Sequence, residues 1–457
     1  MRIVSLVFFL SVAAHAQSTT VVAALPSAPA PSVNFSSQAS ATTAANSGSQ
    51  MTLTRMQAEQ LALKNNPRVS VSQLLALAQH QVVREARAAD LPTATGAITA
   101  EKALDASRIS AGTLTASRVF THAGAGGNFT QLITDFGRTH NLVLTQKLQE
   151  QAANANSLAT KEEIILAADQ AFYDALTAQA VLQVAKQTVS ARQATQTQVN
   201  QMAQNNLKST LDLSFANVNL SQAHLLQLDA QNNADASMAT LDTVLGLDHE
   251  VTYQLIDDAS QNTAPPPDFN PLIQTALTQR PDLQSLTFGQ QSAQKFARAQ
   301  WDQRLPSITA AGTVGTIPIR VDQYYINHWW GGIGVNMNIP IFNGFLYGAE
   351  VKEARYRAQA DAERTRDLRD RIVRDVHTAW LQANTAYQRI EVTAELLKQT
   401  NMALQLAQTR YQLGLSSIVE LTQAQLQQTS AAIDNTNAQY EYRLSLATLN
   451  YQIGVTP

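Results

Sequence analysis

Residues 138–204 read RTHNLVLTQKLQEQAANANSLATKEEIILAADQAFYDALTAQAVLQVAKQTVSARQATQTQVNQMAQ, a stretch of 67 residues with neither glycine nor proline. Most of these residues are Ala, Gln, Leu, Lys or Glu, which favour helix. At 1.5 Å per residue, one helix of this length would extend roughly 100 Å. Because that is several times the average length in globular proteins, the sequence predicts a special architecture built on very long helices.

The helix-compatible region continues beyond a turn. Glycine is absent from residue 138 through residue 245, and no proline occurs between Pro92 and Pro265. We expect the chain to turn at Asn205–Asn206 and to return as a second helix from about Leu211 to Leu245. Asparagine suits this turn because it tolerates the left-handed conformation that often ends a helix.

The pattern occurs a second time, which indicates an internal duplication. A long helix is expected from about Gly344 to Leu413, with its turn at Gly414, the position equivalent to Asn206. Matching motifs are separated by 214 residues before the strands and by 208 after them, as in residues 65–67 and 279–281, or 245–246 and 453–454. The second copy is thus six residues shorter, and the difference falls between Pro92 and about residue 135, where we expect a loop.

Shorter elements precede each long helix. A short helix (58–64; 272–278) leads into a second helix that runs to Leu91 or Leu305, where Pro92 and Pro306 end it. Regions rich in Thr and Gly follow, and their alternating segments predict four strands per chain. The strands are expected at 93–100, 126–133, 308–317 and 333–341.

Four aromatic residues lie close together before the last of these strands. We expect Tyr324, Tyr325, Trp329 and Trp330 in a loop. Aromatic side chains are enriched at membrane interfaces, so they would form either an interfacial girdle or an ordinary packed external loop.

The N-terminal residues indicate export. Residues 1–16 combine Arg2, an apolar run and an Ala-His-Ala cleavage pattern, as in a secretory signal peptide. Residues 17–50 contain no charged residue and are rich in Ala, Ser, Thr and Pro, which predicts a disordered tether. No later window approaches 18 consecutive apolar residues, so no transmembrane helix is expected. We assign residues 51–260 to a first structural repeat, 261–268 to a Pro-rich linker and 269–457 to a second repeat.

Composition excludes several classes of protein. Lys and Arg number 32 against 35 Asp and Glu, and the net charge of −3 gives no sign of nucleic-acid binding. Without cysteine there is no disulfide, thiolate metal site, catalytic thiol or lipid-bearing cysteine. Histidine spacing matches no metal motif, and no catalytic or phosphate-binding motif occurs. We therefore expect no enzyme activity, cofactor or metal, and a secreted hydrolase is the least favoured alternative.

The expected helix surfaces are unusual because Gln, Asn, Thr and Ala fill several faces. Such small and neutral residues suit close packing of helices side by side, with another face toward water. Charge gathers at residues 353–375, which is interpreted as a solvated helix face, with a docking or pore-lining patch as the alternative. Three favourable i,i+4 ion pairs are expected in this segment, namely Glu353/Arg357, Asp367/Arg371 and Asp370/Arg374.

Several motifs in order resemble those of the TolC family of outer-membrane efflux proteins. The resemblance covers roughly residues 51–456, and each motif is specific only as part of the set. The motifs are the opening Leu53-Thr54 to Asn66-Pro67, Arg280-Pro281-Asp282-Leu283, Leu91-Pro92 and Leu305-Pro306, Asp135-Phe136-Gly137-Arg138, Pro340-Ile341-Phe342-Asn343-Gly344, Arg410-Tyr411-Gln412-Leu413-Gly414 and Ile418-Val419-Glu420-Leu421.

The resemblance implies a mainly α fold with a small β portion, assembled as a homotrimer. Four strands from each chain would close a 12-stranded transmembrane β-barrel in the outer-membrane lipid, and the long antiparallel helices would form a trimeric α-barrel through the periplasm. The implied function is the passive exit duct of a tripartite efflux system. A periplasmic adaptor protein and a proton-driven or ABC-type inner-membrane pump would be its partners. A type I protein secretion channel is the alternative, and a fibrous trimeric structural or adhesive protein is less favoured.

The resemblance also implies a periplasmic gate at the helix tips. Glu420 matches an acid of the family's inner ring, whereas Gln423 stands where a second acid is common. Asp212 matches the acid of the first copy and Tyr411 its tyrosine partner, but Ser416 stands where an arginine can form a bridge. Tip turns and adaptor contacts are implied at Asn206, Gly414 and Arg410.

A simpler interpretation of the two acids stays open beside the gate. Glu420 and Asp212 would each begin a return helix, where a carboxylate interacts favourably with the helix dipole. Three symmetry-related carboxylates at a constriction would in addition favour cations. Both roles can hold together.

Overall fold

The computed structural model describes residues 51–457 except 103, 105–107, 112–113, 119–121, 248–252, 258–263, 317–328 and 456–457. The predicted signal peptide and tether, part of the predicted linker, and the aromatic residues Tyr324 and Tyr325 therefore lie outside the described residues.

The described residues form helices of the same lengths in the two halves of the chain. Each half has two short helices, then a helix of 67 residues and a returning helix of 36 residues. The first half contains α1 (Arg55–Asn65), α2 (Pro67–Ala88), α3 (Arg138–Gln204) and α4 (Thr210–Leu245). The second contains α5 (Asn270–Gln279), α6 (Pro281–Asp302), α7 (Leu346–Gln412) and α8 (Ile418–Ile453). The long helices predicted from the missing glycines and prolines are confirmed.

Helix ends differ slightly from the predictions, for local reasons. The second helix of each half ends three residues before the predicted leucine, because residues 89–91 and 303–305 already form turns ahead of the proline. Helix α7 begins at Leu346 and not at Gly344. Gly344 and Phe345 both have a φ of 65°, a left-handed conformation that an α-helix cannot contain.

Four strands form an antiparallel sheet in the order β2-β5-β7-β8, so β2 and β8 are its edges. The strands are β2 (Thr93–Glu101), β5 (His122–Thr134), β7 (Ser307–Thr316) and β8 (Trp329–Asn338). All four predicted strands are present. The last one ends before Pro340, which has no N–H to continue the hydrogen-bond ladder.

The sheet corrects the expectation for two aromatic residues. Trp329 and Trp330 are the first residues of β8, paired with Thr316 and Gly315 of β7, and do not lie in a loop. Aromatic residues favour the pleated backbone of a strand, and the adjacent glycines did not interrupt it.

Two pairs of short strands were not predicted. Strand β3 (Arg108–Ala111) pairs with β4 (Leu114–Arg118) within the segment of the first half where extra residues were expected. Strand β1 (Met51–Leu53) pairs in parallel with β6 (Tyr253–Leu255), which joins the start of the first half to the residues after α4. The strands β1 and β6 have three residues each and lie some 200 residues apart in the sequence, so neither is long enough to show a recognisable alternating pattern.

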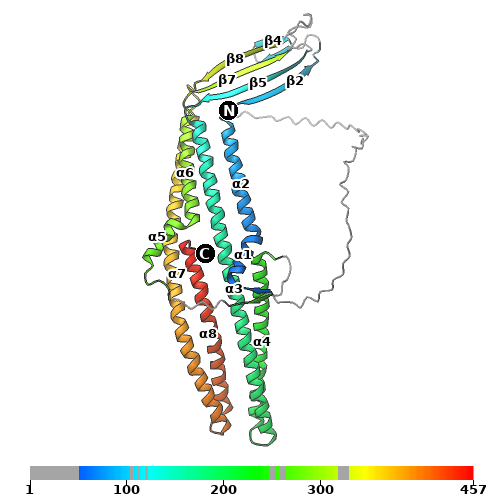
Figure 1. Cartoon of the computed structure of the whole chain (residues 1–457), viewed down its shortest axis with the longest axis vertical. Coiled ribbons are helices and arrows are strands. Elements are labelled where there is room, and N and C mark those ends of the chain that lie inside the picture. The colour runs from blue at the N-terminus through cyan, green and yellow to red at the C-terminus, as the bar shows by residue number, and fades with distance from the viewer. Residues whose placement is uncertain are drawn as a thin grey trace, which may run out of the picture. The chain divides into compact units, whose positions relative to one another are not determined.

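Helix α3 is the centre of the packing and contacts α1, α2, α4, α6 and α8 (Figure 1). Many of its buried positions are alanine, as at Ala168, Ala175 and Ala185, each with 0% exposure. Small side chains let neighbouring helices approach closely, in agreement with the expected close packing. The sheet lies at one end of the helices and both helix–helix turns lie at the other (Figure 1).

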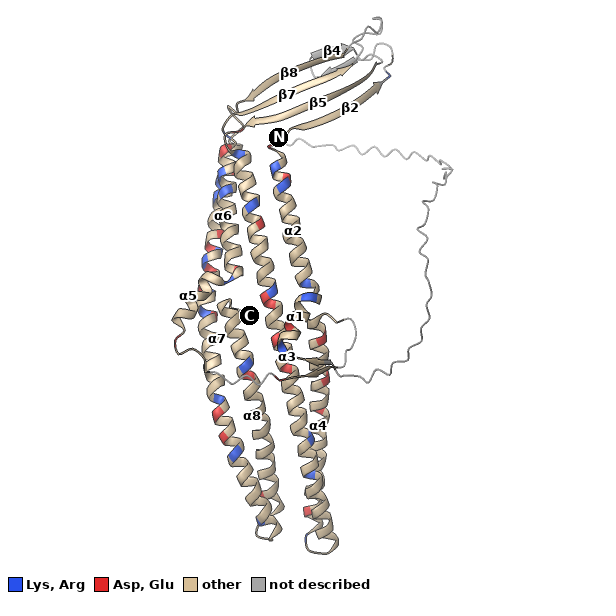
Figure 2. Ribbon diagram, viewed as in Figure 1, with Lys and Arg blue, Asp and Glu red and all other residues tan. Residues whose placement is uncertain are grey.

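Charged residues follow the predicted distribution in part. They are frequent along the half of α7 nearer the sheet and sparse near the turns (Figure 2). The Glu353–Arg357 and Asp367–Arg371 ion pairs form, but the expected Asp370–Arg374 pair does not. The guanidinium of Arg374 instead contacts the neighbouring Asp375 at 2.7 Å.

Candidate functional site at the helix tips

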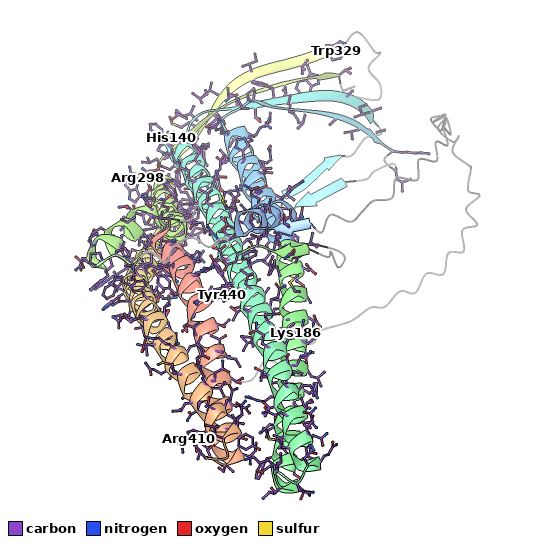
Figure 3. The ribbon with its side chains drawn as sticks, turned by 60° about the horizontal axis from the view of Figure 1, so that its bottom comes forward. His140, Lys186, Arg298, Trp329, Arg410 and Tyr440 are labelled. Atoms are coloured by element: carbon purple, nitrogen blue, oxygen red, sulfur yellow. The ribbon has the colours of Figure 1, made fainter. Side chains whose placement is uncertain are left out.

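The turn of the second hairpin joins α7 to α8. Gly414 adopts the left-handed conformation with a φ of 75°, and Ser417 then caps α8 by accepting a hydrogen bond from the backbone N–H of Glu420. This places the Glu420 carboxylate in the first turn of α8, where the helix dipole favours a negative charge. The Arg410 Nε lies 3.4 Å from the Glu420 Oε1, and both side chains are partly exposed. Arg410 lies at the free end of this hairpin (Figure 3).

The turn of the first hairpin uses the same geometry with different residues. Asn206 has a φ of 57°, as predicted from its equivalence to Gly414. Ser209 and Asp212 form a capping box, in which each side chain accepts a hydrogen bond from the backbone N–H of the other. Asp212 therefore begins the return helix, as the simpler interpretation of this acid predicted.

Tyr411 connects the two hairpins at their tips. Only 3% of its surface is exposed, and it packs in an apolar cluster with residues of all four long helices. The first-hairpin residue Lys208 places its Nζ 4.2 Å from the centre of the Tyr411 ring and 3.5 Å from the Tyr411 carbonyl oxygen. A cation over an aromatic face is attracted to it, so Lys208 holds the first turn against α7. The apolar cluster consists of Val199, Ala216, Ala407, Tyr411, Ile418, Leu421 and Ala424.

The Tyr411 hydroxyl is buried and has no hydrogen-bond partner among the residues that the structure describes. Burial, and secondly the negative charge of Asp212, raise the pKa of Tyr411 to about 12. Asp212 and Tyr411 are thus close enough to interact electrostatically, but the hydrogen bond expected of an acid–tyrosine pair does not form within one chain. The hydroxyl stays neutral and has an unused donor.

Arg192 makes a second connection between the hairpins, farther along α3 from its tip. Its Nη2 donates hydrogen bonds to the carbonyl oxygen of Gln425 at 2.8 Å and to the Thr429 hydroxyl at 3.1 Å, both on α8. Arg192 is 6% exposed, and burial lowers its pKa to about 10, so it is charged at neutral pH. Asn219 of α4 also donates to the Thr422 hydroxyl of α8 at 2.8 Å.

The structure brings together some of the predicted gate residues and separates others. Arg410 contacts Glu420, and Asp212 lies near Tyr411. Ser416 has a buried hydroxyl that makes no hydrogen bond, and so no bridge, to any other described residue. Gln423 is exposed on the surface of α8.

Three of these contact residues were not predicted, namely Lys208, Arg192 and Asn219. One signal was available for Arg192, which is the only charged residue between Lys186 and Lys208 in an otherwise neutral stretch. An isolated charge on a helix of small neutral residues indicates a specific partner. For the amide and hydroxyl pairs no such signal exists, since Asn, Gln and Thr occur throughout these helices.

Two features are absent from the described residues. Within the described ranges, no group of three or more His, Asp or Glu side chains is arranged to hold a metal ion. In the same part of the chain, no helix combines the length and the apolar character needed to cross a membrane.

The chain is similar to a family of known proteins. The model of the outer membrane efflux protein family matches residues 58–247 and 272–455. Outer membrane protein TolC of Salmonella enteritidis is 22% identical over 341 residues, which cover 71% of this chain and 67% of that protein. TolC of Escherichia coli (strain K12) is 22% identical over 342 residues, which cover 71% and 68%.

Solved structures share the fold. The structure of CusC superposes with a TM-score of 0.79 at 19% identity and covers 88% of this chain and 92% of that chain. The Campylobacter jejuni CmeC outer membrane channel gives a TM-score of 0.77 at 17% identity, with 88% and 85% covered. The long paired helices and the four-stranded sheet are therefore an arrangement already known in membrane channels.

Proposed function

Because the chain belongs to the outer membrane efflux protein family, we propose that it is the outer-membrane exit duct of a tripartite efflux system. Substrates would pass through it from the periplasm across the outer membrane without any chemical step. The duct would be a homotrimer that works with a periplasmic adaptor protein and an inner-membrane pump, which supplies the energy.

The observation that supports this proposal most directly is the four-stranded sheet with two open edges. Strands cannot lie in lipid with unpaired backbone groups, so edges β2 and β8 require partners if the sheet crosses a membrane. Three copies joined edge to edge would close a barrel of 12 strands, the assembly that the family resemblance implies. The strands have 9 to 13 residues, a length that suits a tilted crossing of the bilayer.

The residue pattern of the sheet fits this role. Within its four strands the one charged residue is Glu101, at the end of β2. On β8 the side chains of Ile333 and Val335 are 94% and 68% exposed, on the opposite face from Gly334 and Asn336. In a closed barrel the isoleucine face would contact lipid and the small polar face would line the passage.

The helix tips would form the periplasmic gate and the adaptor contact. The first hairpin is held against the second by Lys208 on Tyr411 and by Arg192 on α8. Opening the passage requires these contacts to change, since they join the two hairpins that would move apart. In the trimer, Glu420 would form an acidic ring near the constriction.

Cysteine cross-linking tests the assembly, because the natural chain contains no cysteine. Cysteine pairs with one member on β2 (Ala94 or Ile98) and one on β8 (Ile333 or Val335) would be oxidised in isolated membranes. These strands lie at opposite edges of one sheet, so a disulfide between them joins different copies. We expect at least one pair to yield covalent dimers and trimers.

A matched control has both cysteines on β2, at Ala94 and Ile98, and should stay monomeric on a denaturing gel. Monomers for every β2–β8 pair would contradict the barrel. In cells, deletion of the gene should cause hypersensitivity to toxic compounds, and the uncross-linked variants should restore resistance. Unchanged sensitivity together with a lost secreted protein would assign the duct to secretion and not to efflux.

A further inference from the structure

Away from the tips, helix α1 is attached to α3 by a buried group of three ionisable side chains. Arg55 and Glu59 lie one turn apart on α1, and Asp169 lies opposite them on α3. The Arg55 Nη1 is 2.6 Å from the Glu59 Oε1 and 3.2 Å from the Asp169 Oδ2. Glu59 is 7% exposed and Asp169 is 4% exposed. Both carboxyl groups thus lie away from water around one guanidinium.

The charges in this group do not balance. Two ionised carboxylates and one guanidinium would leave a net charge of −1 in a buried site, which is costly in a medium of low polarity. The contacts do not compensate for it, because among the described residues the buried Asp169 Oδ1 has no hydrogen-bond partner. One proton between the two carboxyl groups would remove the excess charge and provide the missing hydrogen bond.

The second half of the chain shows that the fold does not need this ionic group. At the offsets of the duplication, Arg55 corresponds to Phe269 and Asp169 to His377. These residues stack with their ring centres 4.2 Å apart and their planes 10° from parallel. An aromatic contact can therefore hold the equivalent short helix. The ionic group in the first half must be explained by something other than packing.

We propose that Glu59 and Asp169 share one proton below neutral pH, and that the release of this proton as the pH rises past neutral loosens α1 from α3. The site is a proton-binding carboxyl pair positioned by Arg55. It sits at the junction of α1 and α3, and α1 follows the strand pair β1–β6 that joins the two ends of the first half. Loss of the proton would weaken the attachment of this junction without touching the tips or the sheet.

The electrostatic surroundings support the pair. Burial, and next a hydrogen bond with Glu59, raise the pKa of Asp169 to about 7 against the opposing effect of Arg55. Tyr173, one turn farther along α3, also faces Arg55 and Asp169. Two other charged residues lie near Tyr173, namely Asp257, which follows β6, and Arg443 of α8. They form an ion pair with each other, so they add no net charge.

The direction of the pH effect follows from this shift. A carboxyl group with a higher pKa in the folded chain than in the unfolded chain binds its proton more tightly when folded. Between the unfolded value of about 4 and the folded value of about 7, stability therefore falls as pH rises. Below this window the carboxyl group is protonated in both states, so stability does not depend on pH. Above the window it is ionised in both states, and the loss of stability stays constant.

Infrared spectroscopy of the full-length protein in detergent tests the proton directly. The C=O stretching band of a protonated carboxylic acid should be present below neutral pH and should disappear with a midpoint near pH 7. In Asp169→Asn the band should be absent. This variant retains the Arg55–Glu59 pair and gives Glu59 an amide donor, so it should fold and should lack the loss of thermal stability between pH 5 and pH 8.

Glu163→Gln is the matched control, because it breaks an interhelical ion pair of α3 with Arg68 at 2.9 Å that is exposed. It should leave both the band and the pH dependence unchanged. Hydrogen exchange of α1 amides, corrected for intrinsic rates, should quicken at pH 8 in the natural chain but not in Asp169→Asn. The proposal is overturned if the natural chain has no such band at pH 6, or if Asp169→Asn keeps the natural dependence of stability on pH.

Discussion

The two halves of the chain repeat their backbone features and differ in the side chains placed on them. Just before the proline of the second short helix, Asn66 in the first half donates from its side-chain amide to the carbonyl oxygen of Val244. The equivalent Arg280 donates from its guanidinium to the carbonyl and side-chain oxygens of Gln452. The same junction between a short helix and the end of the return helix is thus held by an amide in one half and a cation in the other.

The tips show the same division. Both turns have a left-handed residue and a serine cap, which are requirements of the backbone. By contrast, Arg410 and Tyr411 of the second tip correspond to Met202 and Ala203 of the first. A duplicated fold therefore keeps what its geometry demands, while the side chains at each contact are free to take separate roles.

The largest expected effect concerns the glycines that end α4 and α8. Gly246 has a φ of 67°, and a Cβ there would lie 2.9 Å from the backbone of Asn65. We expect Gly246→Ala to lower the free energy of unfolding by about 2–4 kcal/mol, from strain and overlap together. Gly454→Ala should cost less, because the nearest atom would be 3.1 Å away. Denaturant unfolding in detergent measures both.

Gly289 is the control for this comparison. It lies inside α6, and a Cβ added there would have no neighbouring atom within 4 Å, so Gly289→Ala should leave stability unchanged or raise it by about 0.5–1 kcal/mol. Equal losses for Gly246→Ala and Gly289→Ala would show that the left-handed turns do not constrain the junction.

The sequence predicted the parts of this molecule that depend on the backbone. Missing glycines and prolines indicated α3 and α7 to within two residues, and the equivalence of Asn206 with Gly414 located both turns. Contacts that depend on the register of two distant helices could not be predicted in the same way. The contact of Lys208 with Tyr411 joins residues about 200 positions apart, and neither residue type indicates which partner it will contact.

The amide and arginine at the short-helix junction give the second largest effect. Arg280→Ala removes a buried cation that also pairs with Asp282 at 2.6 Å, and should cost about 2–3 kcal/mol. Asn66→Ala removes one hydrogen bond and the cap of α2, and should cost about 1–2 kcal/mol. Arg68→Ala, which breaks only an exposed ion pair, is the control and should change thermal stability little. If Asn66→Ala costs more than Arg280→Ala, the two halves are held by contacts other than these.

Arg192 provides a test of the asymmetry between the hairpins. Its equivalent in the second half is Thr400, whose hydroxyl donates hydrogen bonds to carbonyl oxygens of its own helix, α7. Arg192→Met keeps an apolar stem but removes two hydrogen bonds to α8, so we expect a loss of about 1–2 kcal/mol. In planar bilayers the variant should also open more often. Lys186→Met, at an exposed position of the same helix, should change neither stability nor opening. If Arg192→Met behaves like Lys186→Met, Arg192 does not help to hold the two hairpins together.

The smallest effect on stability is expected at the acids that begin α4 and α8. Glu420→Gln breaks a partly exposed ion pair with Arg410 and should change stability by less than about 1 kcal/mol. Asp212→Asn keeps an oxygen that can complete the capping box, so its stability should change as little. The two substitutions should differ in their effect on ion conductance, because only Glu420 is proposed to line the constriction.

Cation selectivity in planar bilayers measures this difference. A second substitution on α8 adds a negative charge and should have the opposite effect. Glu420→Gln should lower the preference for cations, whereas Gln423→Glu, one turn along the exposed surface of α8, should raise it by adding three charges to the trimer. Asp212→Asn should have little effect, since its carboxylate faces its own helix cap and Tyr411. If Glu420→Gln and Gln423→Glu both leave selectivity unchanged, the start of α8 does not face the passage. The acids of both halves would then serve only to begin their helices, and the tips would differ in packing alone.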